Sequence, residues 1–267
     1  MGALGNGARG LAGGTDLVPL LRDGLVAADR LVDLRRVIPS GIDGTAIGAG
    51  TTLAELEADP QIPDALREAC RLAASPQLRN MGTIGGNLLQ ATRCWYWRLN
   101  YPCRLHGGDV CHAREGQHRE HAIFANDYCA SAHPSDVAAA LLALDATVET
   151  TRAAGPLAGL YRLPDDHDRN LVDLGADELI TRIHYERPEQ SVYLKAMDRK
   201  RWAFALVGVA AARYDDGVRL GLAGVAPIPW RLASLDDLEQ ATPLPGTAYK
   251  LELARALGRR AIAAVGG

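Results

Sequence analysis

The sequence lacks an excess of positive charge and lacks a long apolar run. Its 267 residues carry 29 Lys and Arg against 32 Asp and Glu, a formal net charge of -3. Nucleic-acid and anionic-membrane binders carry basic patches, so we expect no nucleic-acid partner and no binding to an anionic membrane. A membrane-spanning helix needs roughly 20 consecutive apolar residues, and the chain offers no such run. We therefore expect no membrane span.

The common signatures of bond-breaking catalysis are missing as well. There is no GxSxG nucleophile elbow and no HExxH zinc motif, although both recur where a chain itself cleaves its substrate. The start of the chain has neither the basic nor the apolar region of a secretory signal, so we expect no general export signal. The sequence favours a holder of redox cofactors over a site where substrate bonds break.

Cysteine is too scarce for a disulfide scaffold, and without an export signal disulfides are the least favoured state of the thiols. The chain has five Cys. Cys70 falls on the apolar stripe of a predicted helix and is expected in the core. The other four lie in residues 92–132, a stretch without apolar periodicity that is rich in Trp, Cys and His. Such a long loop is expected to be ordered by a bound cofactor.

These four cysteines are the candidate metal ligands. Four thiolates are the usual complement of an iron–sulfur cluster, whereas zinc sites bring ligands in close CxxC pairs, which are absent here. Zinc stays an alternative because nearby histidines could join the set. The candidate ligands are Cys94, Cys103, Cys111 and Cys129, and the histidines are His106, His112, His118, His121 and His133.

Two Gly-Gly turns, at residues 13–14 and 85–86, are each followed by a polar residue, Thr15 and Asn87. Glycine lets the backbone come close to phosphate oxygens, and the free N–H groups of a turn bind anions. Neither turn fits GxGxxG after a first strand or GxxxxGK(S/T). Each alone is typical of a plain tight turn, but the pair favours a diphosphate ligand.

The order of predicted elements indicates an α+β fold. Helix and strand pieces come first and an antiparallel sheet with helices follows. We expect a domain at residues 1–158, with the Cys-rich loop inserted at about 92–132, and a second at 159–267. The main expected elements are a helix at 17–21, strands at 30–33, 146–151, 178–185 and 191–196, helices at 64–76, 137–144 and 250–264, and a hairpin of 203–214 with 218–225 around 215–217.

Three segments in this order resemble the FAD-binding medium subunit of the xanthine oxidase family of molybdenum hydroxylases. They are AGGTDL at 12–17, IGAGTT at 47–52 and MGTIGGN at 81–87. The resemblance runs from about residue 10 to 264. It implies a two-lobed PCMH-type FAD-binding domain followed by a C-terminal domain with a small antiparallel sheet and helices.

The resemblance also implies which residues bind FAD. The two turns would cradle the pyrophosphate, Asp136 would accept hydrogen bonds from the flavin side, Ile180 would pack near the ring, and Lys195 would place a cation beside it. The residues implied for the turns and their surroundings are Ala12, Gly13, Gly14, Thr15, Asp16, Leu17, Thr52, Gly82, Thr83, Gly85, Gly86 and Asn87.

The Cys-rich loop resembles two branches of the family that hold a [4Fe-4S] cluster in this subunit, periplasmic aldehyde oxidoreductase and 4-hydroxybenzoyl-CoA reductase. RCWY at 93–96 and CASAHPSD at 129–136 are more similar to the aldehyde oxidoreductase branch. An electron-transfer subunit is implied, with Cys94, Cys103, Cys111 and Cys129 as cluster ligands.

The implied partners are a large subunit with a molybdenum cofactor, a small subunit with two [2Fe-2S] centres, and an external electron acceptor. The alternative from another class is a zinc-stabilised assembly subunit without flavin. Cytoplasm is the default expectation for location, and a periplasmic location would follow from export together with a signal-bearing partner.

Overall fold

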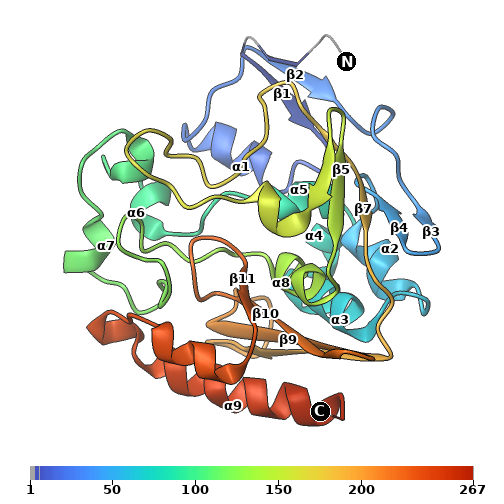
Figure 1. The fold of residues 1–267 in the computed structure, drawn as a ribbon. Helices are drawn as coiled ribbons and strands as arrows, with labels where there is room; N and C mark the ends of the chain where they lie inside the picture. The colour runs from blue at the N-terminus through green and yellow to red at the C-terminus, as the bar shows by residue number, and fades with distance from the viewer. Residues whose placement is uncertain (1–3, 6, 267) are drawn as a thin grey trace.

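The computed structural model describes residues 4–5 and 7–266. Its N-terminal part is a small β-α-β unit, seen at the top of Figure 1, with β1 (Ala8–Leu11), α1 (Leu17–Arg22) and β2 (Arg30–Asp33). β1 and β2 pair in parallel. The strand at 30–33 and the helix from 17 confirm the sequence prediction. The first Gly-Gly turn joins β1 to α1, which leaves its backbone outside both elements.

A five-stranded antiparallel sheet follows, in the order β3-β4-β7-β5-β6. β7 lies at its centre, where Ile183 pairs with Ile47 on one side and Val148 on the other. This pairing carries the sheet across the expected boundary at 158–159, and the division into two domains stays a prediction. The strands are β3 (Ile42–Asp43), β4 (Ala46–Gly48), β5 (Thr147–Thr150), β6 (Ala154–Pro156) and β7 (Ile180–His184).

The second sheet has four antiparallel strands in the order β11-β10-β9-β8. The predicted hairpin is confirmed, with Gly217 at φ 134° after the two-residue turn 215–216. Its first strand begins at Val207, later than the predicted 203. The strands are β8 (Gln190–Ala196), β9 (Val207–Tyr214), β10 (Gly217–Ala223) and β11 (Trp230–Leu232).

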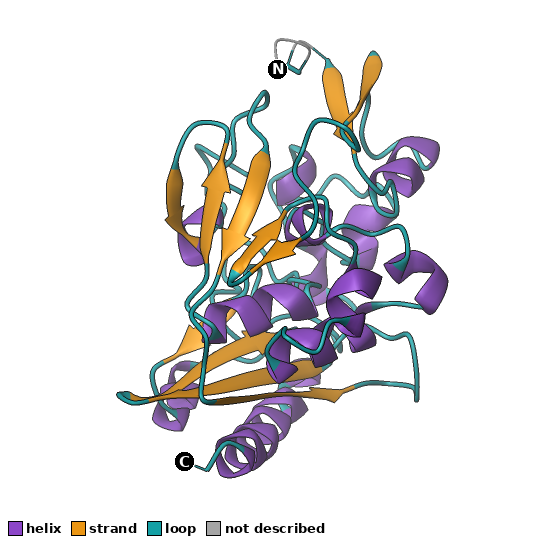
Figure 2. Ribbon diagram, turned by 90° about the vertical axis from the view of Figure 1, so that its right-hand side faces the viewer, coloured by secondary structure: helices purple, strands orange, loops and turns teal. Residues whose placement is uncertain are grey.

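Both faces of this sheet are covered, because side chains of β9 alternate between two cores. Ala210 and Ala212 pack in the core that contains α3 (Asp64–Ala73) and α8 (Asp136–Ala143), while Val209 and Ala211 pack under α9 (Tyr249–Ala264). Figures 1 and 2 show α9 running along the lower side of the sheet. The C-terminal antiparallel sheet and the α+β class agree with the sequence prediction.

The other helices are short. An Asp at the start of the predicted helix 64–76 is typical of an N-cap, but Pro63 is the N-cap, and Pro76 opens a new helix after α3 ends. The Cys-rich loop contains three short helical turns, at the left of Figure 1. No helix in the described part of the chain is long and apolar enough to cross a membrane. The remaining helices are α2 (Leu53–Ala58), α4 (Pro76–Arg79), α5 (Ile84–Leu88), α6 (Trp95–Arg98), α7 (His112–Glu115), η1 (Arg104–His106), η2 (Leu157–Leu160), η3 (Leu235–Gln240) and η4 (Pro245–Thr247).

Candidate functional site

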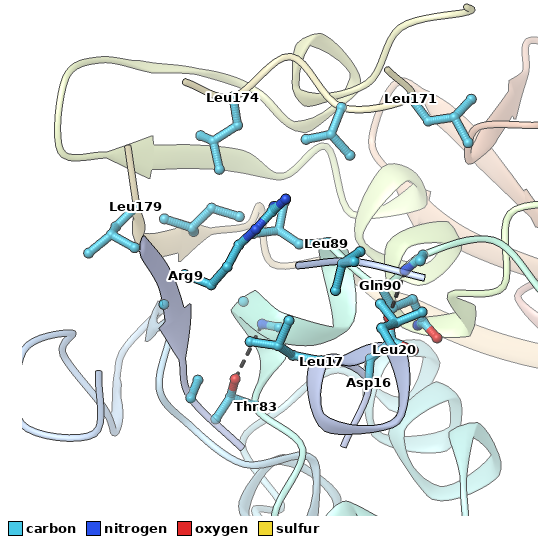
Figure 3. Close-up of a pocket in the computed structure, with 18 of the residues that line it drawn as sticks. Arg9, Asp16, Leu17, Leu20, Thr83, Leu89, Gln90, Leu171, Leu174 and Leu179 are labelled. Atoms are coloured by element: carbon cyan, nitrogen blue, oxygen red, sulfur yellow. Dashed lines mark hydrogen bonds between the residues drawn. The ribbon is translucent and has the colours of Figure 1, made fainter. Parts of the chain in front are cut away.

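A cavity of about 740 Å³ lies between the two Gly-Gly turns and the segment from 169 to 180. Pockets for cofactors span roughly 300–1,000 Å³. In Figure 3, Leu171 and Leu174 lie across the cavity from Thr83, Leu17 and Asp16. The predicted FAD-binding residues that line it are Ala12, Gly13, Gly14, Thr15, Asp16, Leu17, Thr83, Gly85, Gly86 and Ile180.

The two turns are packed so closely that their glycines are needed for space. A Cβ on Gly13 would lie 1.8 Å from the Met81 carbonyl oxygen, and one on Gly85 would lie 2.9 Å from Cβ of Ala49. Gly14 has φ +72°, in the left-handed region that favours glycine. The first turn therefore rests directly on the backbone that leads into the second.

The two turns differ in the backbone donors that they offer. Within the described residues, no hydrogen bond takes up the N–H groups of residues 13–17. In the second turn the N–H of Ile84 donates to Thr51, that of Gly85 donates to Ala49, and that of Gly86 donates to the Thr83 hydroxyl. Free amides in succession form an anion-binding nest. The first turn thus offers free backbone donors, whereas the donors of the second turn are taken up within the protein.

Asp16, at the end of the first turn, is occupied by the protein itself. Its Oδ2 accepts a 2.8 Å hydrogen bond from the N–H of Ala91, and its Oδ1 lies 2.8 Å from Arg93 Nη2 and 3.1 Å from Arg98 Nη2. Burial lowers the pKa of the Arg93 guanidinium, and the Asp16 charge opposes that shift. These contacts tie the first turn to the start of the Cys-rich loop.

Three predicted residues lie beside the cavity without lining it. Thr52 forms a capping box with Glu55 at the start of α2, as their spacing predicts. The Gly82 carbonyl accepts the N–H of Leu53 at 2.9 Å. Asn87 Oδ1 accepts a 2.5 Å hydrogen bond from the Ser135 hydroxyl, which in turn caps α8. The contacts of Gly82 and Asn87 anchor the second turn, and Thr52 pairs with Thr83 of that turn in an isolated β-bridge.

Asp136 and Lys195 also lie off the cavity, and the structure brings them together. Lys195 Nζ donates to Asp136 Oδ2 at 2.7 Å, and the side chains are 0% and 1% exposed. The Tyr193 hydroxyl donates to the other carboxylate oxygen. Burial raises the pKa of Asp136, and the Lys195 ammonium opposes that rise. This buried pair crosses from α8 to β8, a contact that no local sequence pattern indicates.

The four candidate ligand cysteines line one small second cavity, although they are spread over residues 94–129. Aromatic and histidine side chains close it, among them Tyr96, Trp97, His112 and Tyr128. Burial raises the pKa of the Cys94 thiol to about 11 and that of Cys129 to about 12. Within the described residues no three Cys, His, Asp or Glu side chains converge on a single-ion site. Cys70 is buried in the main core, as predicted.

The larger part of the chain matches a known family. The sequence model described as FAD binding domain in molybdopterin dehydrogenase matches residues 2–185. The chain belongs to this family. It is an FAD-binding medium subunit of the molybdenum hydroxylases, as the Gly-turn segments predict.

Curated relatives agree with this assignment, and a solved structure shares the fold. The aldehyde oxidoreductase FAD-binding subunit PaoB of Escherichia coli (strain K12) is 38% identical over 249 residues, covering 86% of this chain and 78% of the relative. The nicotinate dehydrogenase FAD-subunit of Eubacterium barkeri is 27% identical over 280 residues, covering 92% and 80%. The fold matches a carbon monoxide dehydrogenase chain from Hydrogenophaga pseudoflava, with a TM-score of 0.66, 21% identity, and coverage of 99% and 91%.

Sequence reasoning missed one wall of the larger cavity. The polar, Pro-containing stretch 161–169 is typical of a linker, yet Arg169 and the segment that follows line the cavity opposite the turns. Arg169 is held there by donating to the carbonyls of Arg104 and Gly108 in the Cys-rich loop. No periodicity marks this segment, because its position depends on contacts with a loop about 60 residues earlier.

Proposed function

We propose that this chain carries FAD and a [4Fe-4S] cluster and acts as the electron-transfer subunit of a molybdenum-dependent aldehyde oxidoreductase. One observation carries the proposal: ten of the fifteen predicted flavin residues line one cavity, the four cysteines line another, and Trp97 and Leu105 line both. The two cofactors would then share a wall of side chains.

Residues 12–17 would hold the FAD pyrophosphate, since the amides of residues 13–17 are free and the glycines allow close approach. Thr83, Gly85 and Gly86 would form the opposite side of that contact, and Ile180 would pack against the flavin. Bound FAD supplies the electron-accepting and electron-donating chemistry. The chain's own contribution is to bind and orient the cofactor and to exclude water with its leucines.

Cys94, Cys103, Cys111 and Cys129 would hold the cluster. Their shared cavity and aromatic surroundings fit four thiolate ligands screened from solvent. The raised pKa values of Cys94 and Cys129 mean that these thiols are protonated at neutral pH until a metal displaces the protons. Cluster assembly would therefore release protons from this site.

The family and the similarity to PaoB support a proposal for the partners and the substrate class. We propose that a large subunit oxidises an aldehyde at a molybdenum cofactor and that a small subunit with two [2Fe-2S] centres passes the electrons to FAD here. An external acceptor would then reoxidise the flavin. The similarity to an aldehyde oxidoreductase subunit favours this substrate class over a 4-hydroxybenzoyl-CoA reductase role.

The test is a visible spectrum of the complex purified anaerobically with its partner chains, combined with iron and zinc analysis. Flavin bands, and iron beyond that of two [2Fe-2S] centres that disappears in Cys111→Ser, are the expected result. Zinc in place of the extra iron would keep the flavoprotein role and overturn the cluster. Absence of flavin would overturn the proposal in favour of the assembly subunit.

A further inference from the structure

Cys94 has a buried imidazole partner. Nε2 of His121 lies 3.2 Å from Sγ of Cys94, although 27 residues separate them in the chain. His121 is 2% exposed, and its ring packs edge-on against that of Trp95, with centroids 4.8 Å apart. Packing therefore holds the ring in an orientation that directs Nε2 at the sulfur.

The direction of this hydrogen bond follows from the chemistry of the sulfur. A cysteine that binds iron is a thiolate, which can only accept. His121 must then donate from Nε2, and its neutral ring carries no hydrogen on Nδ1. Nδ1 is buried and makes no hydrogen bond to any described residue. Among the described residues, no acceptor therefore holds the ring hydrogen on Nδ1 instead of Nε2.

Hydrogen bonds to cluster sulfurs are among the factors that set the reduction potential of an iron–sulfur centre. The reduced cluster carries one more negative charge than the oxidised cluster. A hydrogen-bond donor therefore stabilises the reduced form and raises the reduction potential. We propose that His121 is a positioning residue that sets the potential of the iron–sulfur cluster through its Nε2–H bond to Cys94. This inference rests on the proposed function, because it requires the cluster to be present.

The experiment compares two variants in the whole complex with its partner chains. His121→Phe keeps a flat ring against Trp95 but removes the N–H, and His121→Gln offers an amide N–H in its place. The readout is an EPR-monitored redox titration of the signal that Cys111→Ser eliminates. At a fixed potential we expect the ratio of reduced to oxidised cluster to fall about tenfold in His121→Phe. This corresponds to a midpoint potential lower by about 59 mV for one electron. In His121→Gln the ratio should recover partly.

His106→Gln is the matched control, since His106 lies in the same loop but stacks on Trp97, and its Nδ1 lies 3.3 Å from the Tyr101 carbonyl oxygen and not at a cysteine sulfur. Its titration should match that of the unmodified complex. An unchanged midpoint in His121→Phe with full iron content overturns the inference and leaves the cluster intact. Loss of iron from both His121 variants, with flavin retained, would make His121 a ligand and also overturn it. An unmodified complex without the extra iron overturns the proposed cluster itself.

Discussion

The carboxylate of Asp16 accepts the N–H of Ala91 across 75 residues of sequence, at 2.8 Å. This contact joins the turn proposed to bind pyrophosphate to the residues that lead into the cysteine loop. Arg93 and Arg98 reinforce it with ion pairs to the same carboxylate. The two proposed cofactor sites are therefore mechanically connected through one side chain.

Asp16→Ala should lower flavin and iron content together. It leaves the Arg93 and Arg98 guanidinium groups, 29% and 18% exposed, without their carboxylate partner. Because these groups are partly buried, we expect a loss of about 1–3 kcal/mol in unfolding free energy. The flavin-to-protein and iron-to-protein ratios of the purified complex measure the coupling. Asp23→Ala, which affects an exposed pair with Arg22, should change neither ratio.

Gly13→Ala should abolish flavin binding. Its Cβ would lie 1.8 Å from the Met81 carbonyl oxygen, so the two turns must move apart. Overpacking of this kind costs about 1–3 kcal/mol or more. Gly159→Ala is the control, because a Cβ there meets nothing within 4 Å. Flavin absorbance and urea denaturation check both variants. Normal flavin content in Gly13→Ala would contradict the proposed role of the first turn.

Lys195→Met should destabilise the fold, because it leaves the Asp136 carboxylate buried without its cation. Removing one partner of a fully buried pair costs about 3–5 kcal/mol. The double variant with Asp136→Asn should recover most of this loss, measured as unfolding free energy in urea. Arg255→Met, which breaks an exposed pair with Glu252, should cost less than about 1 kcal/mol. If the double variant recovers stability but the flavin potential shifts, the cation acts on the flavin as the family resemblance implies.

His133 should make the protein sensitive to acid. Burial lowers its pKa to about 3, against 6.5 for an ordinary histidine in the unfolded chain. Between pH 3 and pH 6.5 this histidine is protonated in the unfolded chain but neutral in the folded protein. The unfolding free energy therefore decreases as pH falls below about 6.5 and keeps decreasing towards pH 3. One proton gives a slope of about 1.4 kcal/mol per pH unit.

His133→Phe tests this expectation. The variant loses the ring nitrogen that accepts the Ser135 N–H, at a cost of about 1 kcal/mol at neutral pH. Its unfolding free energy should nevertheless depend less on pH between 4 and 6 than that of the unmodified protein. Parallel pH profiles for the two proteins would show that His133 is not the group responsible.

Much of the fold could be predicted because its signals are local. The periodic stripe of α9 and the Gly217 turn of the hairpin are fixed by residues close in sequence. The central position of β7 could not be predicted, since it depends on pairing with β4 some 130 residues earlier. For the site, residue types located the turns and the cysteines. The Asp136–Lys195 pair and the His121–Cys94 contact join distant segments and leave no local pattern.

The position of β7 also determines when the flavin cavity can exist during synthesis. Its strand completes the sheet between β4 and β5, and the cavity draws residues from both before and after it, from Leu4 to Pro227. A nascent chain that has emerged only as far as the cysteine loop has both glycine turns but only part of the cavity that encloses a cofactor. We therefore expect FAD to be captured late, after the second half of the chain has left the ribosome, so that the cofactor acts on a nearly finished protein.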